Sequence, residues 1–158
     1  MPINNNLSLD NELINGLQMD AIDLLKSLIA IPSFSKEEDK TAAILIDFFA
    51  ARKIKTERLI NNIWATNLHF DSNKPSLLLN SHHDTVKPNK GYTVDPFHPF
   101  EKEGKLYGLG SNDAGGCLVS LLATFLYFYD KENLPYNIIF AASAEEEISG
   151  HDGIELIL

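Results

Sequence analysis

The stretch Ser76-Leu77-Leu78-Leu79-Asn80-Ser81-His82-His83-Asp84-Thr85-Val86 joins a short apolar run to a polar triplet of two imidazoles and a carboxylate. The apolar run predicts a buried strand, and the polar residues predict a site at its carboxyl end, where ligands bind in open α/β sheets. His82 and Asp84 are two residues apart, so in extended backbone both side chains leave on one face and His83 points away. Taken alone, the triplet also fits a strand end capped by solvated polar residues.

Two later clusters repeat the pattern of a segment that ends in a carboxylate. Leu106-Tyr107-Gly108-Leu109-Gly110-Ser111-Asn112-Asp113 carries alternate glycines and ends just before an apolar helix pattern. Ala141-Ala142-Ser143-Ala144-Glu145-Glu146-Glu147 follows a second buried apolar run. His82, Asp113 and Glu147 are therefore separated by about thirty residues, the length of a βαβ step. We expect the three side chains to meet at one edge of a sheet.

Composition and charge limit the classes of function. A chain of 158 residues with 44% hydrophobic content can form one domain with a core. Its net charge of -9 argues against a nucleic-acid or anionic-membrane partner, which would favour a basic face. The one cysteine, Cys117, excludes an internal disulfide framework, and we expect it to be a small buried thiol. No leader-like segment or membrane-spanning run is evident, so we expect a cytoplasmic protein.

The first third of the chain predicts two packing helices. Residues 1–17 are expected to form a loosely held tail or a short first turn. From Met19 apolar residues recur at helical spacing until Pro32 stops the helix. Ser35-Lys36-Glu37-Glu38 predicts a capping box for a second helix, whose apolar stripe includes Phe49.

The rest of the chain alternates strands with one buried helix. Residues 54–59 and 63–70 predict a hairpin with a turn at Asn61-Asn62. Residues 105–107 predict a short strand and 115–129 a helix packed on a sheet. The final residues begin like an amphipathic helix without a cap, so the sequence is expected to be cut. The fold class expected is mixed α/β, with a largely parallel central sheet flanked by helices.

The other histidines and the single tryptophan are assigned no role in the site. His69 lies near the end of a predicted strand, and His98 stands in the loop of residues 87–99. His151 is four residues past Glu147, but a solvated loop position is expected for it. Trp64 is expected to pack in or beside the core.

The residues of the three clusters permit two-metal hydrolytic chemistry. Zinc accepts imidazole and carboxylate ligands, so His82 would bind one metal, Glu147 the other, and Asp113 could bridge the two. A second carboxylate, Glu146, would take the proton from the attacking water, and Asp84 would hold the other nitrogen of His82. The alternative for the glutamate run is an exposed acidic start of a helix.

The motifs resemble those of the dizinc aminoacylase and carboxypeptidase family, which includes acetylornithine deacetylase and succinyl-diaminopimelate desuccinylase. The resemblance rests on Ser81-His82-His83-Asp84-Thr85-Val86, on Tyr107-Gly108-Leu109-Gly110-Ser111-Asn112-Asp113, and on Glu145-Glu146-Glu147 with Gly150 following. It covers nearly the whole chain. The flanking Lys87-Pro88 and the loop with Asp95-Pro96-Phe97 look closest to the acetylornithine deacetylase-like branch.

The resemblance implies a role for each motif residue. His82 and Glu147 would be metal ligands, Asp113 the bridging ligand, Asp84 the residue that orients His82, and Glu146 the general base. It implies two Zn²⁺ ions per complete site, with cobalt or manganese possible, and a homodimeric full-length relative. The chain departs from the family at Gly115, where a Lys is common. Further ligands and a dimerisation domain would lie beyond Leu158.

The leading interpretation is therefore the N-terminal part of a metallohydrolase catalytic domain, residues 18–158, that removes an acyl group from a small N-acyl amino acid. Dipeptidase, aminoacylase and succinyl-diaminopimelate desuccinylase activities are alternatives within the same family. A non-catalytic fragment that binds metal or a partner is an alternative from another class. A dinucleotide-binding module is disfavoured, because no third glycine follows Gly110 at the required place and Asp113 would repel a phosphate.

Overall fold

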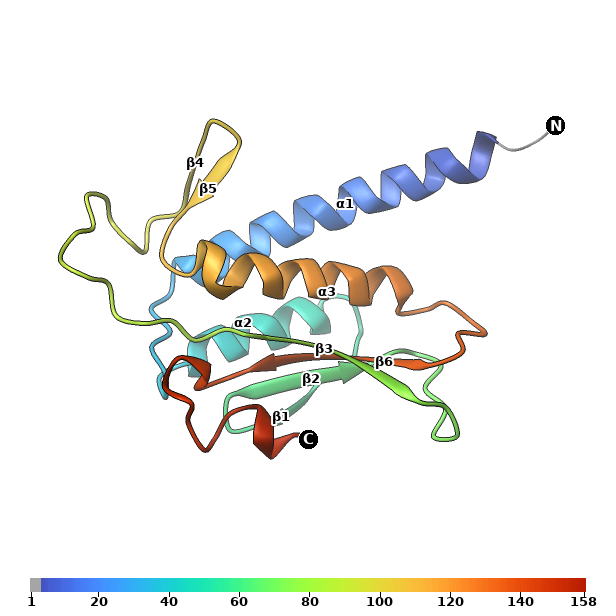
Figure 1. Cartoon of the computed structure of the whole chain (residues 1–158). Helices are drawn as coiled ribbons and strands as arrows, with labels where there is room; N and C mark the ends of the chain where they lie inside the picture. The colour runs from blue at the N-terminus through green and yellow to red at the C-terminus, as the bar shows by residue number, and fades with distance from the viewer. Residues whose placement is uncertain (1–3) are drawn as a thin grey trace.

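A computed structural model describes residues 4–158, and it arranges three helices on one side of a four-stranded sheet (Figure 1). The sheet has the order β1-β2-β6-β3. The parallel pairing is that of β3 with β6, while β1 with β2 and β2 with β6 are antiparallel. The predicted class, mixed α/β with a mixed sheet and flanking helices, is confirmed, but the sheet is not largely parallel, because two of its three strand pairings are antiparallel. The strands of this sheet are β1 (Glu57–Leu59), β2 (Asn62–Thr66), β3 (Ser76–His82) and β6 (Asn137–Ser143).

The remaining elements of the described residues are a small hairpin, the three helices and three short helical turns. A two-stranded hairpin of β4 (Phe100–Lys102) and β5 (Lys105–Tyr107) projects near the C-terminal end of α1 (Figure 1). The helices are α1 (Asn4–Ile29), α2 (Asp39–Ala50) and α3 (Cys117–Phe128), with short helical turns η1 (Ser111–Gly116), η2 (Glu146–Ile148) and η3 (Ile154–Leu156).

The core lies between the helices and the sheet. Phe49 of α2, Phe125 of α3 and Phe140 of β6 are all fully buried. Their ring centroids are 5.6 to 6.0 Å apart, which is the range of favourable aromatic contacts. Because each ring comes from a different element, this cluster fixes both helices relative to the central strand.

The first helix is longer than predicted. Instead of starting near Met19, α1 begins at Asn4, so most of the segment predicted as a tail is helical, and residues 1–3 lie outside the described part. Its buried residues begin at Ala21, where α1 packs against the rest of the domain. Leu9, Leu13 and Leu17 continue the helical spacing toward the N-terminus, so the prediction gave too much weight to the polar, Asn-rich composition of this segment.

Three local predictions are wrong. No side-chain cap begins α2, whose N-cap residue is Glu38, and the hydroxyl of Ser35 instead binds Asp84. Cys117 is exposed, because it starts α3 on the side away from the core. The last segment forms only the short turn η3 in place of an amphipathic helix.

Burial differs between the two parallel strands. In β6 the apolar residues except the half-buried Ile139 are buried, as predicted, because this strand is paired on both sides. In β3, however, Leu77 is 47% and Leu78 37% exposed, which corrects the prediction of a buried strand. The reason is that β3 is an edge strand within the described residues, so its apolar run has a neighbour on one side only.

Within residues 4–158, no helix is both long and apolar enough to span a membrane.

Candidate metal centre

Three of the predicted ligands lie together at the carboxyl end of the parallel strand pair. His82 ends β3, Asp113 lies in η1 and Glu147 in η2. One ligand atom from each side chain can be chosen so that all three atoms lie within 4.8 Å of one another. Segments about thirty residues apart in the sequence therefore converge as the spacing predicted.

The register of the sheet explains why His82 and the glutamates are neighbours. In the parallel pair His82 is aligned with Ser143, the last residue of β6. The amide of His83 then donates to the carbonyl oxygen of Ser143 at 3.0 Å. Because both strands end at the same level, the residues that follow β6 turn directly over the end of β3.

His82 is oriented through one ring nitrogen and presents the other. Nδ1 lies 3.1 Å from the carbonyl oxygen and 3.3 Å from Oδ1 of Asp84. Nε2 lies 3.2 Å from Oδ1 of Asp113 and 3.5 Å from Oε2 of Glu146. The hydrogen bond with Asp84 raises the pKa of His82 to about 9, against burial, which lowers it. In the absence of metal the imidazole is therefore protonated at neutral pH.

Asp84 is the centre of the hydrogen-bond network beneath the site. Its two carboxylate oxygens accept from the Ser35 hydroxyl at 2.7 Å and from the amides of Glu146 and Glu147 at 3.1 Å each. Burial alone would raise the pKa of this carboxyl, but the hydrogen bonds from His82, Ser35 and the two amides hold it at about 2. Asp84 thus stays ionised and fixes both His82 and the glutamate turn.

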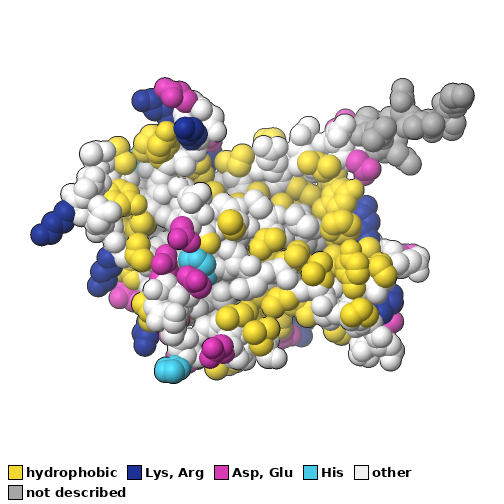
Figure 2. Space-filling model, in the orientation of Figure 1, with side chains coloured by type: hydrophobic (Ala, Val, Ile, Leu, Met, Phe, Trp, Pro, Cys, Tyr) yellow, Lys and Arg dark blue, Asp and Glu magenta, His cyan; other side chains and the backbone are white. Residues whose placement is uncertain are grey.

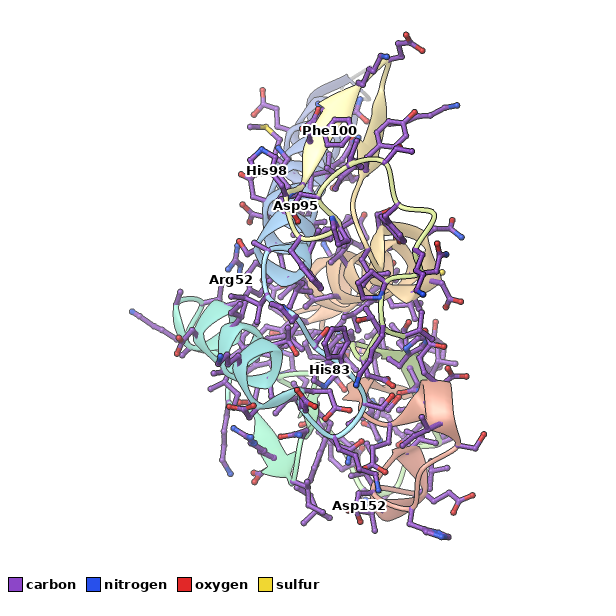
Figure 3. The ribbon with its side chains drawn as sticks, turned by 90° about the vertical axis from the view of Figure 1, so that its left-hand side faces the viewer. Arg52, His83, Asp95, His98, Phe100 and Asp152 are labelled. Carbon is purple, nitrogen blue, oxygen red and sulfur yellow. The ribbon has the colours of Figure 1, made fainter. Side chains whose placement is uncertain are left out.

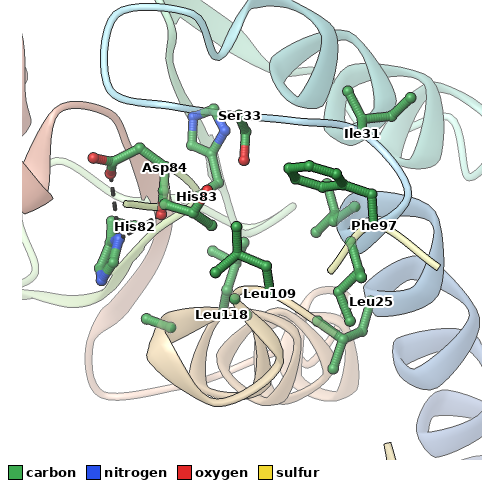
Figure 4. Close-up of a pocket in the computed structure, with 15 residues that line it drawn as sticks. Leu25, Ile31, Ser33, His82, His83, Asp84, Phe97, Leu109 and Leu118 are labelled. Carbon is green, nitrogen blue, oxygen red and sulfur yellow. Dashed lines mark hydrogen bonds and ion pairs between the residues drawn. The ribbon is translucent and has the colours of Figure 1, made fainter. Parts of the chain in front are cut away.

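His83 points away from the centre, as the alternation of the strand predicted. Its Nδ1 lies 2.9 Å from the hydroxyl of Thr41, and its Nε2 lies 2.9 Å from the carbonyl oxygen of Asn61. Burial lowers the pKa of His83, so this imidazole is neutral. In Figure 4 His82 is joined to Asp84, and the pocket behind them is walled by apolar side chains that include Leu109 and Leu118.

Carboxylates gather on the exposed side of His82. Figure 2 shows acidic side chains clustered around a histidine on this face. The side chain of Asp113 is 77% exposed and that of Glu146 59%. Burial, and next the charge of Asp113, raise the pKa of Glu147. These carboxylates outnumber the single positive charge of protonated His82, and a divalent cation would supply further positive charge.

The donor set fits a metal ion. One imidazole with its second nitrogen held by a carboxylate, together with two carboxylates, is a combination that zinc accepts. His82, Asp113 and Glu147 could hold such an ion, and Glu146 stands beside them without belonging to the three-residue group. These metal and base roles remain predictions, since the geometry shows proximity only.

A cavity of about 350 Å³ opens next to these ligands. Its lining includes Asp113 and Glu147 together with Thr85, Val86 and Tyr92. The backbone at Gly110, which has a φ of 77°, forms part of its wall, and this left-handed conformation favours glycine. A small substrate could therefore reach the carboxylates from solvent.

The histidines to which no role was assigned lie outside this group. His69, His98 and His151 are exposed. Figure 3 shows His98 beside Asp95 and Phe100, well separated from His83. None of the three belongs to the group of His82, Asp113 and Glu147, and their lack of a ligand role remains a prediction.

Two residues that hold the site were missed. Ser35 and Glu38 were assigned to a helix cap, yet Ser35 binds Asp84 and Glu38 binds the amide of Glu145. The only signal in the sequence was a pair of polar residues in a short loop between two apolar helices. Such residues fit a helix cap equally well as a long-range contact, here with Asp84, 49 residues from Ser35, and with Glu145, 107 residues from Glu38.

Comparisons of the sequence with known proteins identify one family of peptidases and its relatives. A family model described as Peptidase family M20/M25/M40 matches residues 78–158. A probable succinyl-diaminopimelate desuccinylase of Staphylococcus aureus is 28% identical over 144 residues, covering 89% of this chain and 36% of the relative. An N-fatty-acyl-amino acid synthase/hydrolase of Xenopus tropicalis is 29% identical over 171 residues, covering 98% of this chain and 33% of the relative.

Similarity of structure supports the same fold. A Bacillus subtilis protein described as a dinuclear metal binding peptidase from the M20 family superposes with a TM-score of 0.66 at 15% identity. That match covers 90% of this chain and 39% of the solved structure. The chain therefore spans roughly a third of the length of the relatives that it matches.

Proposed function

The chain belongs to peptidase family M20/M25/M40, and from this we propose that residues 18–158 are the N-terminal part of the catalytic domain of a metal-dependent amidohydrolase. The observation that carries the proposal is the convergence of His82, Asp113 and Glu147 within 4.8 Å at one sheet edge. The sequence relatives named above are both named for N-acylated amino compounds. We therefore propose removal of an acyl group from an N-acyl amino acid as the reaction.

The residues divide the work of amide hydrolysis. When bound, divalent metal ions supply Lewis acidity, which polarises a carbonyl and makes water easier to deprotonate. His82, Asp113 and Glu147 would hold the ion, and Asp84 keeps Nε2 of His82 directed at the site. Glu146 has an exposed carboxylate beside them and would take a proton from the attacking water and return it to the leaving amine.

The identity of the acyl group is a finer part of the proposal. An acetylornithine deacetylase-like activity is the first candidate, while desuccinylase and dipeptidase activities fit the same residues. The full-length relative would act as a homodimer on small molecules, with zinc as the first candidate metal and cobalt or manganese as alternatives. These assignments rest on resemblance of the motifs rather than on a contact to a substrate.

The test compares two variants of the same centre. We expect Glu146→Gln to retain zinc and lose hydrolysis of N-acetyl and N-succinyl amino acids, and His82→Ala to lose zinc. Both variants are made in the full-length protein, where metal analysis measures the first property and release of the free amino acid measures the second. Undiminished hydrolysis by Glu146→Gln would remove Glu146 from the mechanism.

A second candidate is a metal-binding fragment without catalytic activity. It is favoured by the count of ligands, since the described residues bring three side chains together where two metals require more. Two zinc ions per chain would support the hydrolase. One ion or none, without turnover of any N-acyl amino acid, would support the fragment.

A further inference from the structure

Glu38 is a buried carboxylate that the proposed mechanism does not use. It has no exposed surface and lies at the start of α2. Oε1 accepts from the amide of Lys36 at 2.8 Å and from the amide of Glu145 at 3.1 Å, and Oε2 accepts from the side-chain amide of Asn61 at 2.8 Å. One carboxylate thus joins three separate segments of the chain.

The segment reached by Oε1 is the turn that carries the candidate base and ligand. The amides of three consecutive residues, Glu145, Glu146 and Glu147, all donate to two buried carboxylates, those of Glu38 and Asp84. With their amides bound on the inner side, Glu146 and Glu147 place their carboxylates toward His82. The carboxylates of Glu38 and Asp84 together therefore fix the backbone position of this turn relative to the ends of β3 and β6.

The backbone conformation of Glu145 is unfavourable and requires stabilising contacts. Its φ of 55° and ψ of 22° lie in the left-handed region, where a residue other than glycine is disfavoured. This conformation turns the chain from β6 into η2. Asp84 binds only the two residues that follow, so within the described contacts Glu38 is the side chain that fixes the amide of Glu145 itself.

We propose that Glu38 is a positioning residue for the catalytic turn, acting through the amide of Glu145 to hold the carboxylate of Glu147 at the metal centre. The inference rests on the metal role proposed above for Glu147. Glu38 does not touch the centre, so its effect is on the geometry of the ligand rather than on the reaction. The competing explanation is a purely structural acid that stabilises the start of α2.

The length of the side chain and its charge can be separated. Glu38→Asp keeps the charge at the start of the helix but is one methylene too short to reach the amide of Glu145. Glu38→Gln keeps the length and one oxygen that can accept from that amide, but loses the charge. Asn61→Ala is the matched control, since it removes a buried hydrogen bond to Oε2 and leaves Oε1 on the turn.

The experiment titrates the complete chain with Zn²⁺ in competition with a chromophoric chelator. We expect Glu38→Asp to weaken zinc binding about 10- to 100-fold, the usual effect of losing a residue that supports a ligand. Glu38→Gln and Asn61→Ala should stay within about threefold of the parent chain. Hydrogen exchange of the metal-free chain should show faster exchange at the amides of residues 145–147 in Glu38→Asp alone.

Each result has a defined meaning. Parent-like zinc affinity and exchange in Glu38→Asp, or a larger loss in Glu38→Gln than in Glu38→Asp, would overturn the positioning role, because charge rather than reach would then matter. Equal losses in Asn61→Ala would reduce Glu38 to a structural acid. Failure of the parent chain to bind zinc would instead refute the proposed function, while the exchange measurement would still test the contact between Glu38 and the turn.

Discussion

Replacing Asp84 by Asn removes the residue on which the network beneath the centre depends. The two oxygens of Asp84 accept from Ser35, from two backbone amides and from His82, and the side chain is only 1% exposed. An asparagine offers one oxygen in place of two, so at least one buried donor must lose its partner. The protonated ring of His82 would also lose its neighbouring charge.

The magnitude follows from the pKa of His82. Its rise from 6.5 to about 9 corresponds to roughly 3 to 4 kcal/mol of favourable interaction in the folded state, at about 1.4 kcal/mol per pH unit. The fall of the Asp84 pKa from 3.8 to about 2 describes the same network and is not added. Breaking a buried charged pair by removing one partner costs about 3 to 5 kcal/mol. We expect Asp84→Asn to lower the free energy of unfolding by about 3 to 5 kcal/mol near neutral pH.

The effect has a defined dependence on pH. The pKa of His82 is raised on folding, so its contribution is fully present below pH 6.5 and is lost as the pH rises through about 9. The pKa of Asp84 is lowered, so its contribution is present above pH 3.8 and is lost as the pH falls through about 2. The difference between the parent and the variant should therefore be largest between pH 3.8 and 6.5.

Urea denaturation of the metal-free chain at about pH 6 and about pH 9.5, with NMR titration of the histidine ring protons, measures both effects. In Asp84→Asn the pKa of His82 should fall toward its ordinary value. Asp130→Asn, at an exposed position, is the control and should change stability by less than about 0.5 kcal/mol. A His82 pKa that stays near 9 in Asp84→Asn, or a stability difference that does not vary with pH, would refute the reasoning.

Three further predictions concern metal binding and packing. Zinc must displace a proton from His82, so its affinity should rise roughly tenfold per pH unit between about pH 6 and 8, measured by chelator competition; an affinity independent of pH would contradict this. Gly115→Ala should lower the melting temperature and cost about 2 kcal/mol or more, because an added Cβ would lie 2.5 Å from the Gly110 carbonyl oxygen and from Leu25. Phe49→Ala should cost about 3 to 5 kcal/mol in urea denaturation, since it empties the centre of the aromatic core.

Gly115, the one departure from the family motif within the chain, is closely packed. The chain has Gly115 where members of the family that it resembles commonly have a Lys. In the structure the backbone of Gly115 packs against Gly110, and its amide donates to the Gly110 carbonyl oxygen at 2.9 Å. A side chain here would require η1 or Leu25 to move.

The candidate site was predictable where its residues follow strands. Alternation in β3 predicted that His82 and Asp84 share a face and that His83 turns away, and the contacts of all three agree. Burial was less predictable. The leucines of β3 resemble those of a central strand, but whether Leu77 is covered depends on which strands pair beside it, and among residues 4–158 β3 is paired on one side only.

What the sequence determined by itself was local: the order of the main helices and of the strands of the central sheet, the faces on which His82, His83 and Asp84 lie, and the residue types at the ends of β3 and β6. These properties depend on neighbours two to four positions away, so spacing alone reveals them. What only the tertiary structure decided was which distant groups share hydrogen bonds. Ser35 and Glu38 reach Asp84 and Glu145 because a loop folds over the ends of β3 and β6, and no local pattern encodes a contact across 107 residues.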